Sequence, residues 1–161
     1  MRILSWEELT QAEKYMIKAR EIAELATCER SKCWSIIVKD WMIIWEGFNS
    51  PAKNLESQRR CNNDKSLYNR KVTDKTCCIH AEQRALFDAL RKHPDLIEWA
   101  TLYFIRLNKE WKMTTSWKPY CTICSKSALE LWIKEFVLLH ENWITAYDTE
   151  EYNILSYQYT D

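Results

Sequence analysis

The amino-acid sequence predicts an α/β fold in which helices cover both faces of a mixed central sheet. Segments with apolar residues at helical spacing alternate with short runs of β-branched and aromatic residues, in the order helix, hairpin, helix, strand, helix, strand. Connections through helices favour parallel pairing of the later strands. A chain of 161 residues is long enough for one core and too short for two ordinary domains, so we expect a single domain over residues 1–161.

The first part of the chain is predicted to form a helix and then a β-hairpin. Ser5 and Glu8 have the spacing of a capping box, and an apolar stripe runs from there to a predicted helix end near Thr27. The stripe comprises Leu9, Ala12, Met16, Ala19, Ala23 and Ala26. Two β-rich runs, 33–40 and 42–45, then flank a polar turn at Asp40.

The remaining elements follow a polar, basic segment at about 50–76, which we interpret as an insertion loop. Residues 78–91 are predicted to form an amphipathic helix that Pro94 stops. Further strands are expected at 100–108, 134–140 and 144–147, and further helices at 122–132 and 148–157.

Charge and hydropathy argue against two classes of partner. The 23 basic residues balance 23 acidic ones, so no whole-molecule field draws the chain to nucleic acid. No apolar run reaches the ~18 residues of a membrane span, and the start, "MRILSWEELT", lacks the plan of a secretory signal. We therefore expect a cytoplasmic protein with no membrane partner, in which the seven cysteines are thiols or metal ligands.

Two motifs carry the candidate chemistry, "CIHAEQRAL" at 78–86 and "KPYCTICSKSAL" at 118–129. Each lies where a loop enters a predicted helix. Cys121 and Cys124 are one helical turn apart and can bind one tetrahedral Zn²⁺ with His80 as the third ligand, which leaves the fourth position to water. Glu82 is then placed to take a proton from that water. Cys-x-x-Cys alone fits a structural zinc knuckle or a redox pair equally well, and the accompanying His-Ala-Glu favours the catalytic interpretation.

These residues resemble the cytidine/deoxycytidylate deaminase superfamily, whose signature is His-x-Glu followed by Pro-Cys-x-x-Cys. His80-Ala81-Glu82 fits this signature fully, whereas Tyr120 separates Pro119 from Cys121. The segment "GFNSP" at 47–51 resembles the Gly-Tyr-Asn-Gly-x-Pro segment of the deoxycytidylate branch. The resemblance implies a cytidine-deaminase-like sandwich, and the family is usually oligomeric, which implies a homo-oligomer.

The resemblance also implies a reaction, the hydrolytic deamination of a dCMP-like cytosine nucleotide. In that reaction zinc lowers the pKa of its water from 15.7 toward roughly 7, and Glu82 shuttles protons to the ring and to the departing ammonia. Asn49 matches the asparagine that contacts the sugar, and the Ala81 backbone matches the position that holds the base. Lys53, Arg59 and Arg60 could supply positive charge to a phosphate, or belong to a solvated loop.

Two other function classes remain open. One is a deaminase acting on adenosine or cytidine in transfer RNA or other nucleic acid, which needs a basic track with aromatic platforms. The other is a non-catalytic zinc-binding module, which Glu82 disfavours.

A second, structural zinc is the next hypothesis from the cysteines. In the deoxycytidylate branch some members carry such an ion between the insertion and the end of the first helix, and Cys28, Cys61 and Cys78 fall at comparable places. Cys77 could complete a four-thiolate site, although adjacent cysteines rarely bind one tetrahedral ion without strain. Alternatively, Cys33 and one of the adjacent pair are small buried apolar residues.

Composition contains one anomaly, a single glycine beside nine tryptophans, where average usage of roughly 7% predicts about eleven glycines. Eight tryptophans stand where this fold favours glycine: Trp34, Trp41, Trp45, Trp99, Trp111, Trp117, Trp132 and Trp143. Trp41, Trp111 and Trp143 lie in turns suited to positive φ, and Trp132 follows a helix end. Our hypothesis is that UGA codons for glycine have been translated as tryptophan. Deliberate substitution and genuine tryptophan enrichment are the alternatives.

Overall fold

The computed structural model describes residues 1–68, 78–108, 110–116, 118–141 and 143–159. A mixed sheet with the order β1-β7-β6-β4-β2-β3 forms its centre, and β5 pairs with β4. The strands are β1 (Arg2–Ile3), β2 (Lys32–Lys39), β3 (Met42–Phe48), β4 (Thr101–Leu107), β5 (Met113–Thr114), β6 (Glu135–Leu139) and β7 (Ile144–Asp148). The helices are α1 (Trp6–Ala23), α2 (Ala81–Lys92), α3 (Pro94–Ile97), α4 (Thr122–Glu130) and α5 (Thr149–Tyr157).

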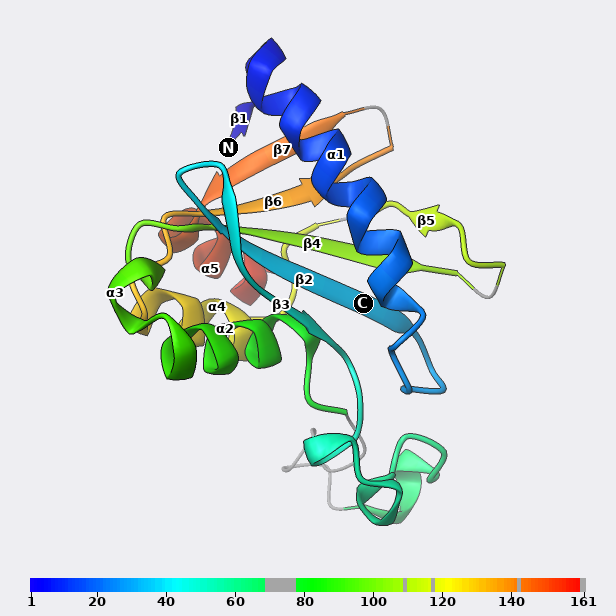
Figure 1. Ribbon diagram of the computed structural model, residues 1–161. Helices are drawn as coiled ribbons and strands as arrows, with labels where there is room; N and C mark the ends of the chain where they lie inside the picture. Colours follow the sequence, from blue (N-terminus) through cyan, green and yellow to red (C-terminus); the bar gives the residue numbers. More distant parts are fainter. Residues whose placement is uncertain (69–77, 109, 117, 142, 160–161) are drawn as a thin grey trace.

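Helices cover both faces of this sheet, which confirms the predicted α/β/α sandwich. α1 crosses one face, while α2, α4 and α5 lie on the other (Figure 1). Each face has its own apolar core: Ala12 and Met16 of α1 pack on one side, and Leu86 of α2 packs in the same core as Phe136 on the other. The central strands β2, β4 and β6 are therefore buried on both faces.

The first helix begins as predicted and ends earlier. The Ser5 hydroxyl accepts a bond from the Glu8 amide at 3.3 Å, and the Glu8 carboxylate accepts one from the Ser5 amide at 2.8 Å, so the capping box is present. The predicted end near Thr27 is wrong, because α1 stops at Ala23. The amides of Leu25 and Ala26 bond to carbonyls three residues back, which closes the helix in a tighter turn.

Strand directions follow the length of each connection. β4 and β6, joined through α4, are parallel as predicted. The expectation of parallel later strands is wrong for β7, which pairs antiparallel with β6. The link between Leu139 and Ile144 is too short for the crossover that a parallel pair requires.

The hairpin of β2 and β3 turns at Asp40 and Trp41, as predicted. Both residues have positive φ, 48° and 64°, which is the backbone of a two-residue type I′ turn. Further along β3, the backbone of Gly47 lies against α2: a Cβ at Gly47 would fall 2.5 Å from the Ala81 carbonyl oxygen. A glycine is required here because the strand and the helix that carries the candidate site touch through their backbones.

The later elements lie close to their predicted positions. α2 begins at Ala81 rather than at Cys78, because His80 is its N-cap residue, and Pro94 begins the short α3. The predicted final helix is α5, whose N-cap Asp148 accepts bonds from the Glu150 and Glu151 amides. In the insertion, three short 3₁₀ helices span Ala52–Asn54, Glu56–Gln58 and Lys65–Leu67. Residues 69–77, including Cys77, lie outside the described residues.

Within the residues described, no helix is both long and apolar enough to span a membrane.

Candidate active site and metal centres

The side chains of His80, Cys121 and Cys124 meet between two helix N-termini. His80 is the N-cap of α2, and Cys121 is the N-cap of α4 with Cys124 in its first turn. The Nδ1 atom of His80 lies 3.3 Å from the Sγ atoms of both cysteines, and the two Sγ atoms are 3.2 Å apart. The structure thus brings the three predicted ligands together, although His80 and Cys121 are 41 residues apart in the chain.

These three atoms fit a tetrahedral zinc ion. Bonds of ~2.3 Å to sulfur and ~2.0 Å to nitrogen place ligand atoms roughly 3.5 Å apart, close to the spacing found here. The Cys124 thiol, with help from His80, lowers the pKa of Cys121 to about 4 despite the burial of the thiol. A thiolate that forms this readily suits a metal ligand.

Glu82 lies beside this cluster in the first turn of α2 and is 3% exposed. Burial, reinforced by the nearby Cys121, raises the pKa of Glu82 to about 7. A carboxyl group with such a pKa can both accept and return a proton near neutral pH.

A small pocket of about 110 Å³ opens over Glu82 and His80. Both predicted substrate contacts, Asn49 and Ala81, line it, together with Phe104 at the sheet. The Asn49 side chain is engaged by the backbone: its Oδ1 accepts from the Cys33 amide and its Nδ2 donates to the Ser31 carbonyl, each at 2.9 Å. Asn49 therefore fixes Ser31 and the first residues of β2, where Ser31 and Cys33 also line the pocket.

Comparison with protein families identifies this arrangement. Residues 9–140 match the model of the cytidine and deoxycytidylate deaminase zinc-binding region. The chain belongs to the cytidine and deoxycytidylate deaminase family. It is accordingly a zinc-dependent deaminase, a hydrolase of C–N bonds, and the predicted resemblance is confirmed.

Solved structures share the fold of this deaminase at low identity. The dCMP deaminase of cyanophage S-TIM5 in its apo form has a TM-score of 0.56 and 20% identity, over 83% of this chain and 82% of that one. The same enzyme in complex with dCMP and dUMP has a TM-score of 0.53 and 20% identity, over 77% of this chain and 76% of that one. A cytidine deaminase from Burkholderia pseudomallei has a TM-score of 0.54 and 18% identity, over 92% of this chain and 96% of that one. No curated protein matches the chain.

A second group of cysteines is among the residues that line the same pocket. The Sγ atoms of Cys28, Cys61 and Cys78 all lie within 4.8 Å of one another, a spacing that could hold a metal ion. Cys28 follows α1, Cys61 comes from the insertion, and Cys78 precedes α2. Cys33 is not a member of the group, and burial raises its pKa to about 12, as expected of an apolar-packed thiol.

Hydrogen bonds join the insertion to the loop after α1 around these cysteines. The guanidinium of Arg59 donates to the Thr27 carbonyl at 2.7 Å, and that of Arg30 donates to the Asn63 carbonyl at 3.0 Å. The Thr27 hydroxyl donates to Asn54 Oδ1 at 2.7 Å. The insertion lies beyond the end of the sheet where β3 leaves it (Figure 1), and its residue Cys61 lines the pocket.

Sequence reasoning missed four residues that line the pocket, Arg30, Ser31, Phe104 and Tyr120. Arg30 is the one Lys or Arg among the described lining residues, whereas Lys53, Arg59 and Arg60 do not line it. Tyr120 lines the pocket and stands directly before Cys121, where the family signature has proline, while Pro119 itself is buried. The extra residue between Pro119 and Cys121 was the signal for Tyr120. For Arg30 the sequence offered no signal beyond its charge.

Proposed function

We propose that this protein deaminates a free cytosine nucleotide of the dCMP type, with His80, Cys121 and Cys124 as zinc ligands and Glu82 as the catalytic proton shuttle. The observation that carries the proposal is the position of Glu82, buried at the base of a pocket beside a three-ligand cluster. A purely structural zinc site needs neither this carboxyl group nor the adjoining cavity.

Each side chain has a defined part in this reaction. Zinc, when bound, lowers the pKa of a water molecule toward ~7 and so makes a nucleophile available at neutral pH. Glu82 takes a proton from the attacking water and delivers it to the ring nitrogen of cytosine. The oxygen of that water forms a bond to the ring carbon that bears the amino group. As the C–N bond breaks, Glu82 takes the proton of the new hydroxyl group and passes it to the amino group, which leaves as ammonia. The burial of Glu82 keeps bulk water away from these transfers.

The size of the pocket supports a single ring as its occupant. At about 110 Å³ it is smaller than the ~300–1,000 Å³ typical of sites that enclose a whole ligand, so the sugar and phosphate extend out of it. Ala81 and Phe104 border the space for the base, and so does Tyr120, which is partly exposed to solvent.

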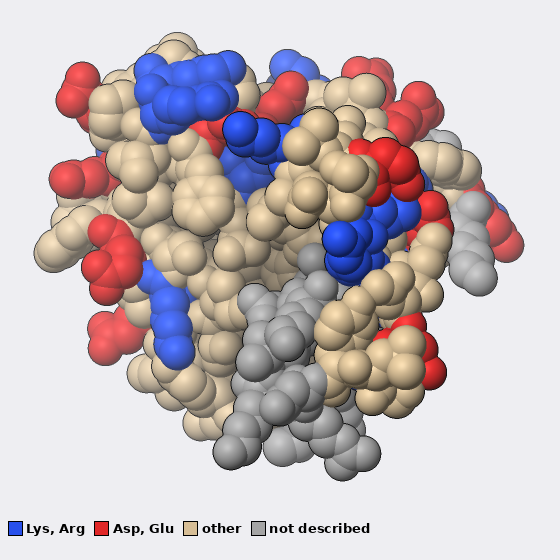
Figure 2. Space-filling view, turned by 90° about the horizontal axis from the view of Figure 1, so that it is seen from below, with Lys and Arg blue, Asp and Glu red and all other residues tan. Residues whose placement is uncertain are grey.

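A phosphate at the mouth meets Arg30, which is why we favour a nucleotide over a nucleoside. Arg30 lines both this pocket and an adjoining groove of about 1220 Å³. Cys28 and Ser31 also line both cavities. A guanidinium can bind a phosphate through two parallel hydrogen bonds. Nucleic acid is disfavoured because acidic and basic side chains are interspersed on the face shown in Figure 2 rather than forming a basic track.

We also propose that Cys28, Cys61 and Cys78 hold a second, structural zinc. Three cysteines from segments far apart in sequence converge here, two of them 2–4% exposed. An ion among them would fix the insertion against the loop that carries Arg30. Cys77, a candidate fourth ligand, lies outside the described residues.

The experiment measures ammonia release by the zinc-loaded protein with each of five substrates: dCMP, CMP, deoxycytidine, cytidine and a transfer RNA stem-loop. We expect the highest kcat/KM with dCMP or CMP and at least a tenfold lower value with the nucleosides. Preference for the stem-loop, or equal rates on nucleotide and nucleoside, would contradict the proposal.

A further inference from the structure

Four tryptophans have a backbone conformation that tryptophan rarely adopts. Trp41, Trp99, Trp111 and Trp132 have φ of 64°, 62°, 61° and 56°. Only a few per cent of non-glycine residues have positive φ, and for a bulky residue this conformation is a strained outlier. Of the nine tryptophans in the chain, fewer than one is therefore expected there.

The turn that follows α4 shows what the backbone requires. The Trp132 amide bonds to the Leu129 carbonyl and the Ile133 amide to the Ala128 carbonyl, both at 3.0 Å. These two bonds are the complete Schellman motif, in which the residue at Trp132 is in the left-handed region and is usually glycine. The chain forms this motif although the residue in the left-handed position, Trp132, has the largest side chain of all.

The other three positions are also turns with defined geometry. Trp41 is the second residue of the type I′ hairpin turn, where Asp-Gly is the favoured pair, and it follows Asp40. Trp111 lies in the turn at which the Trp111 amide bonds to the Asn108 carbonyl at 3.1 Å, between β4 and β5. Trp99 follows α3, and its amide bonds to the Trp132 carbonyl at 2.7 Å.

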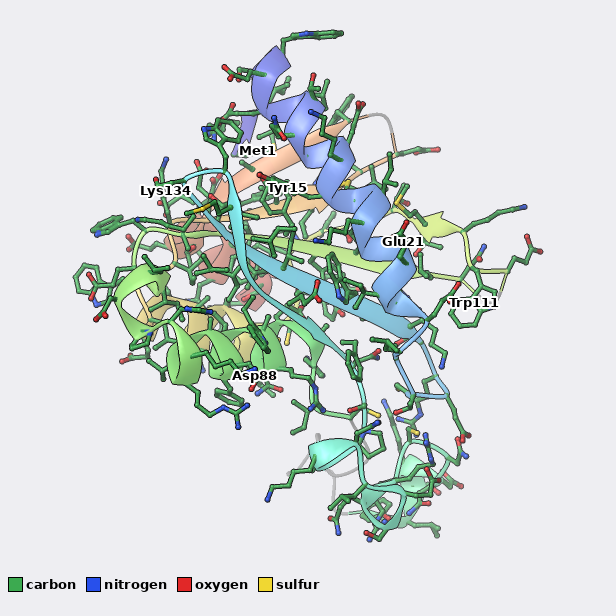
Figure 3. The ribbon with its side chains drawn as sticks, in the orientation of Figure 1. Met1, Tyr15, Glu21, Asp88, Trp111 and Lys134 are labelled. Carbon is green, nitrogen blue, oxygen red and sulfur yellow. The ribbon has the colours of Figure 1, made fainter. Side chains whose placement is uncertain are left out.

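Burial of the four side chains does not compensate for this strain. Trp41, Trp99 and Trp132 are 52%, 58% and 60% exposed, and Trp111 is 41% exposed. Figure 3 shows Trp111 out at the end of the β4–β5 hairpin, beside the sheet rather than within it. The rings of Trp99 and Trp132 lie against each other, with centroids 5.9 Å apart. Both side chains nevertheless remain exposed, and both residues have strained backbone. Packing into the core therefore does not select tryptophan at these positions.

The buried indole nitrogens of two tryptophans, Trp34 and the half-buried Trp45, add a different signal. Trp34 is fully buried in β2, and the Nε1 atoms of Trp34 and Trp45 have no hydrogen-bond partner among the residues described. Buried indole N–H groups normally find an acceptor, because leaving one unpaired loses its hydration without replacement.

We propose that glycine is the encoded residue at these six positions, and at Trp117 and Trp143 by the same sequence pattern, because the source organism reads UGA as glycine. Translation that assigns UGA to tryptophan then produces the chain with one glycine and nine tryptophans. Trp6 is excepted: it begins α1, has helical backbone and needs no glycine. Trp6 is therefore the internal control.

This inference goes beyond the proposed function and is independent of it, because no tryptophan is a candidate zinc ligand or a described lining residue of the pocket over Glu82. It does change the larger groove. Trp111 and Trp143 are the tryptophans among its described lining residues, and glycine at both removes the two indole rings. An aromatic platform for bases, as a nucleic-acid-binding deaminase would use, is then absent from this part of the groove.

The first test is the gene and the native protein. We expect UGA codons at the eight positions and UGG at Trp6, and peptides from source cells with the mass of glycine at the eight positions and of tryptophan at residue 6. UGG codons at positions 41, 99, 111 and 132, or tryptophan at them in native peptides, would overturn the proposal.

The second test measures urea unfolding of two proteins. One is the chain that contains nine tryptophans, and the other is a variant that carries glycine at positions 41, 99, 111 and 132. We expect the variant to unfold at a higher urea concentration, because the left-handed backbone loses its strain. Trp6→Gly is the matched control, and we expect it to lower the midpoint, since glycine weakens a helix. A four-glycine variant no more stable than the nine-tryptophan chain would contradict the physical basis of the proposal.

Discussion

Gly47 and Ala81 are in backbone contact. A Cβ built on Gly47 would lie 2.5 Å from the Ala81 carbonyl oxygen and 2.5 Å from the Ala85 amide nitrogen. No side-chain rotation relieves such a contact, because both neighbours are main-chain atoms of α2. The first turn of α2 carries Glu82 and follows His80, so the absent side chain of Gly47 sets the position of the candidate site relative to the sheet.

Gly47→Ala tests this contact. We expect a loss of about 3 kcal/mol in the free energy of unfolding, at the upper end of the cost of overpacking, because α2 must move to admit the methyl group. The movement should also lower zinc content and kcat. Urea unfolding and metal analysis measure both effects. Glu46→Ala, at the preceding strand position, is the control, and a Gly47→Ala protein as stable as that control would show that the contact is not rigid.

Glu82→Gln should separate zinc binding from turnover. The amide keeps the size of the side chain and cannot shuttle protons, so kcat should fall by ~10²–10⁴ while zinc content stays unchanged. Ammonia release and metal analysis give the two quantities. Glu46→Gln changes a half-buried glutamate of β3, outside the metal cluster, and should leave both unchanged. Full activity of Glu82→Gln would remove the proposed mechanism.

Arg30→Ala should weaken the reaction with nucleotides and leave the reaction with nucleosides unchanged. Loss of a charge-assisted hydrogen bond of ~1.5–3 kcal/mol corresponds to a rise of roughly 10–100-fold in KM for dCMP. The kcat/KM for deoxycytidine should not change. Arg60→Ala, a basic residue of the insertion that does not line the pocket, is the matched control. An equal loss on dCMP and deoxycytidine would assign Arg30 a structural role.

Cys61→Ser and Cys33→Ala distinguish the second zinc from a packed thiol. Cys61 is in the three-cysteine group and Cys33 is outside it, although both are buried. We expect the zinc content of the purified protein to fall from near two per chain to near one in Cys61→Ser and to stay unchanged in Cys33→Ala. If the unmodified protein contains only one zinc, the two-site proposal is wrong.

Tyr120 is expected to hold the base through its ring rather than its hydroxyl. Stacking of a base on an aromatic side chain contributes ~1–3 kcal/mol, so Tyr120→Ala should raise KM for dCMP by about tenfold or more. Tyr120→Phe keeps the ring and should keep KM. Steady-state kinetics of the two variants test this, and an equal rise in both would point to the hydroxyl instead.

Short-range patterns in the sequence predicted much of the fold and the metal ligands. The capping box at Ser5, the turn at Asp40 and the Cys-x-x-Cys spacing each depend on neighbours within a few residues, and the structure contains all three features. The predicted end of α1 is wrong because its last apolar residue, Ala26, packs in the turn after the helix rather than within it. The antiparallel direction of β7 follows from the length of its connection, which the alternation of helices and strands does not encode.

Features that join distant segments could not be derived from local pattern. Nothing near Arg30 in the sequence indicates that it lines the same pocket as Glu82, or that Asn49 would bond to the backbone of Ser31 and Cys33. The requirement for glycine at Gly47 likewise appears only when α2 lies on β3.

By itself, the sequence determined the α/β class, the candidate zinc ligands, Glu82 and the anomaly of one glycine beside nine tryptophans, because each is a matter of residue type and local spacing. The tertiary structure decided that Cys28, Cys61 and Cys78 lie together without Cys33, that Arg30 lines the pocket, and that four tryptophans have left-handed backbone. These are properties of distance and dihedral angle, and both are fixed only when helices and strands pack together.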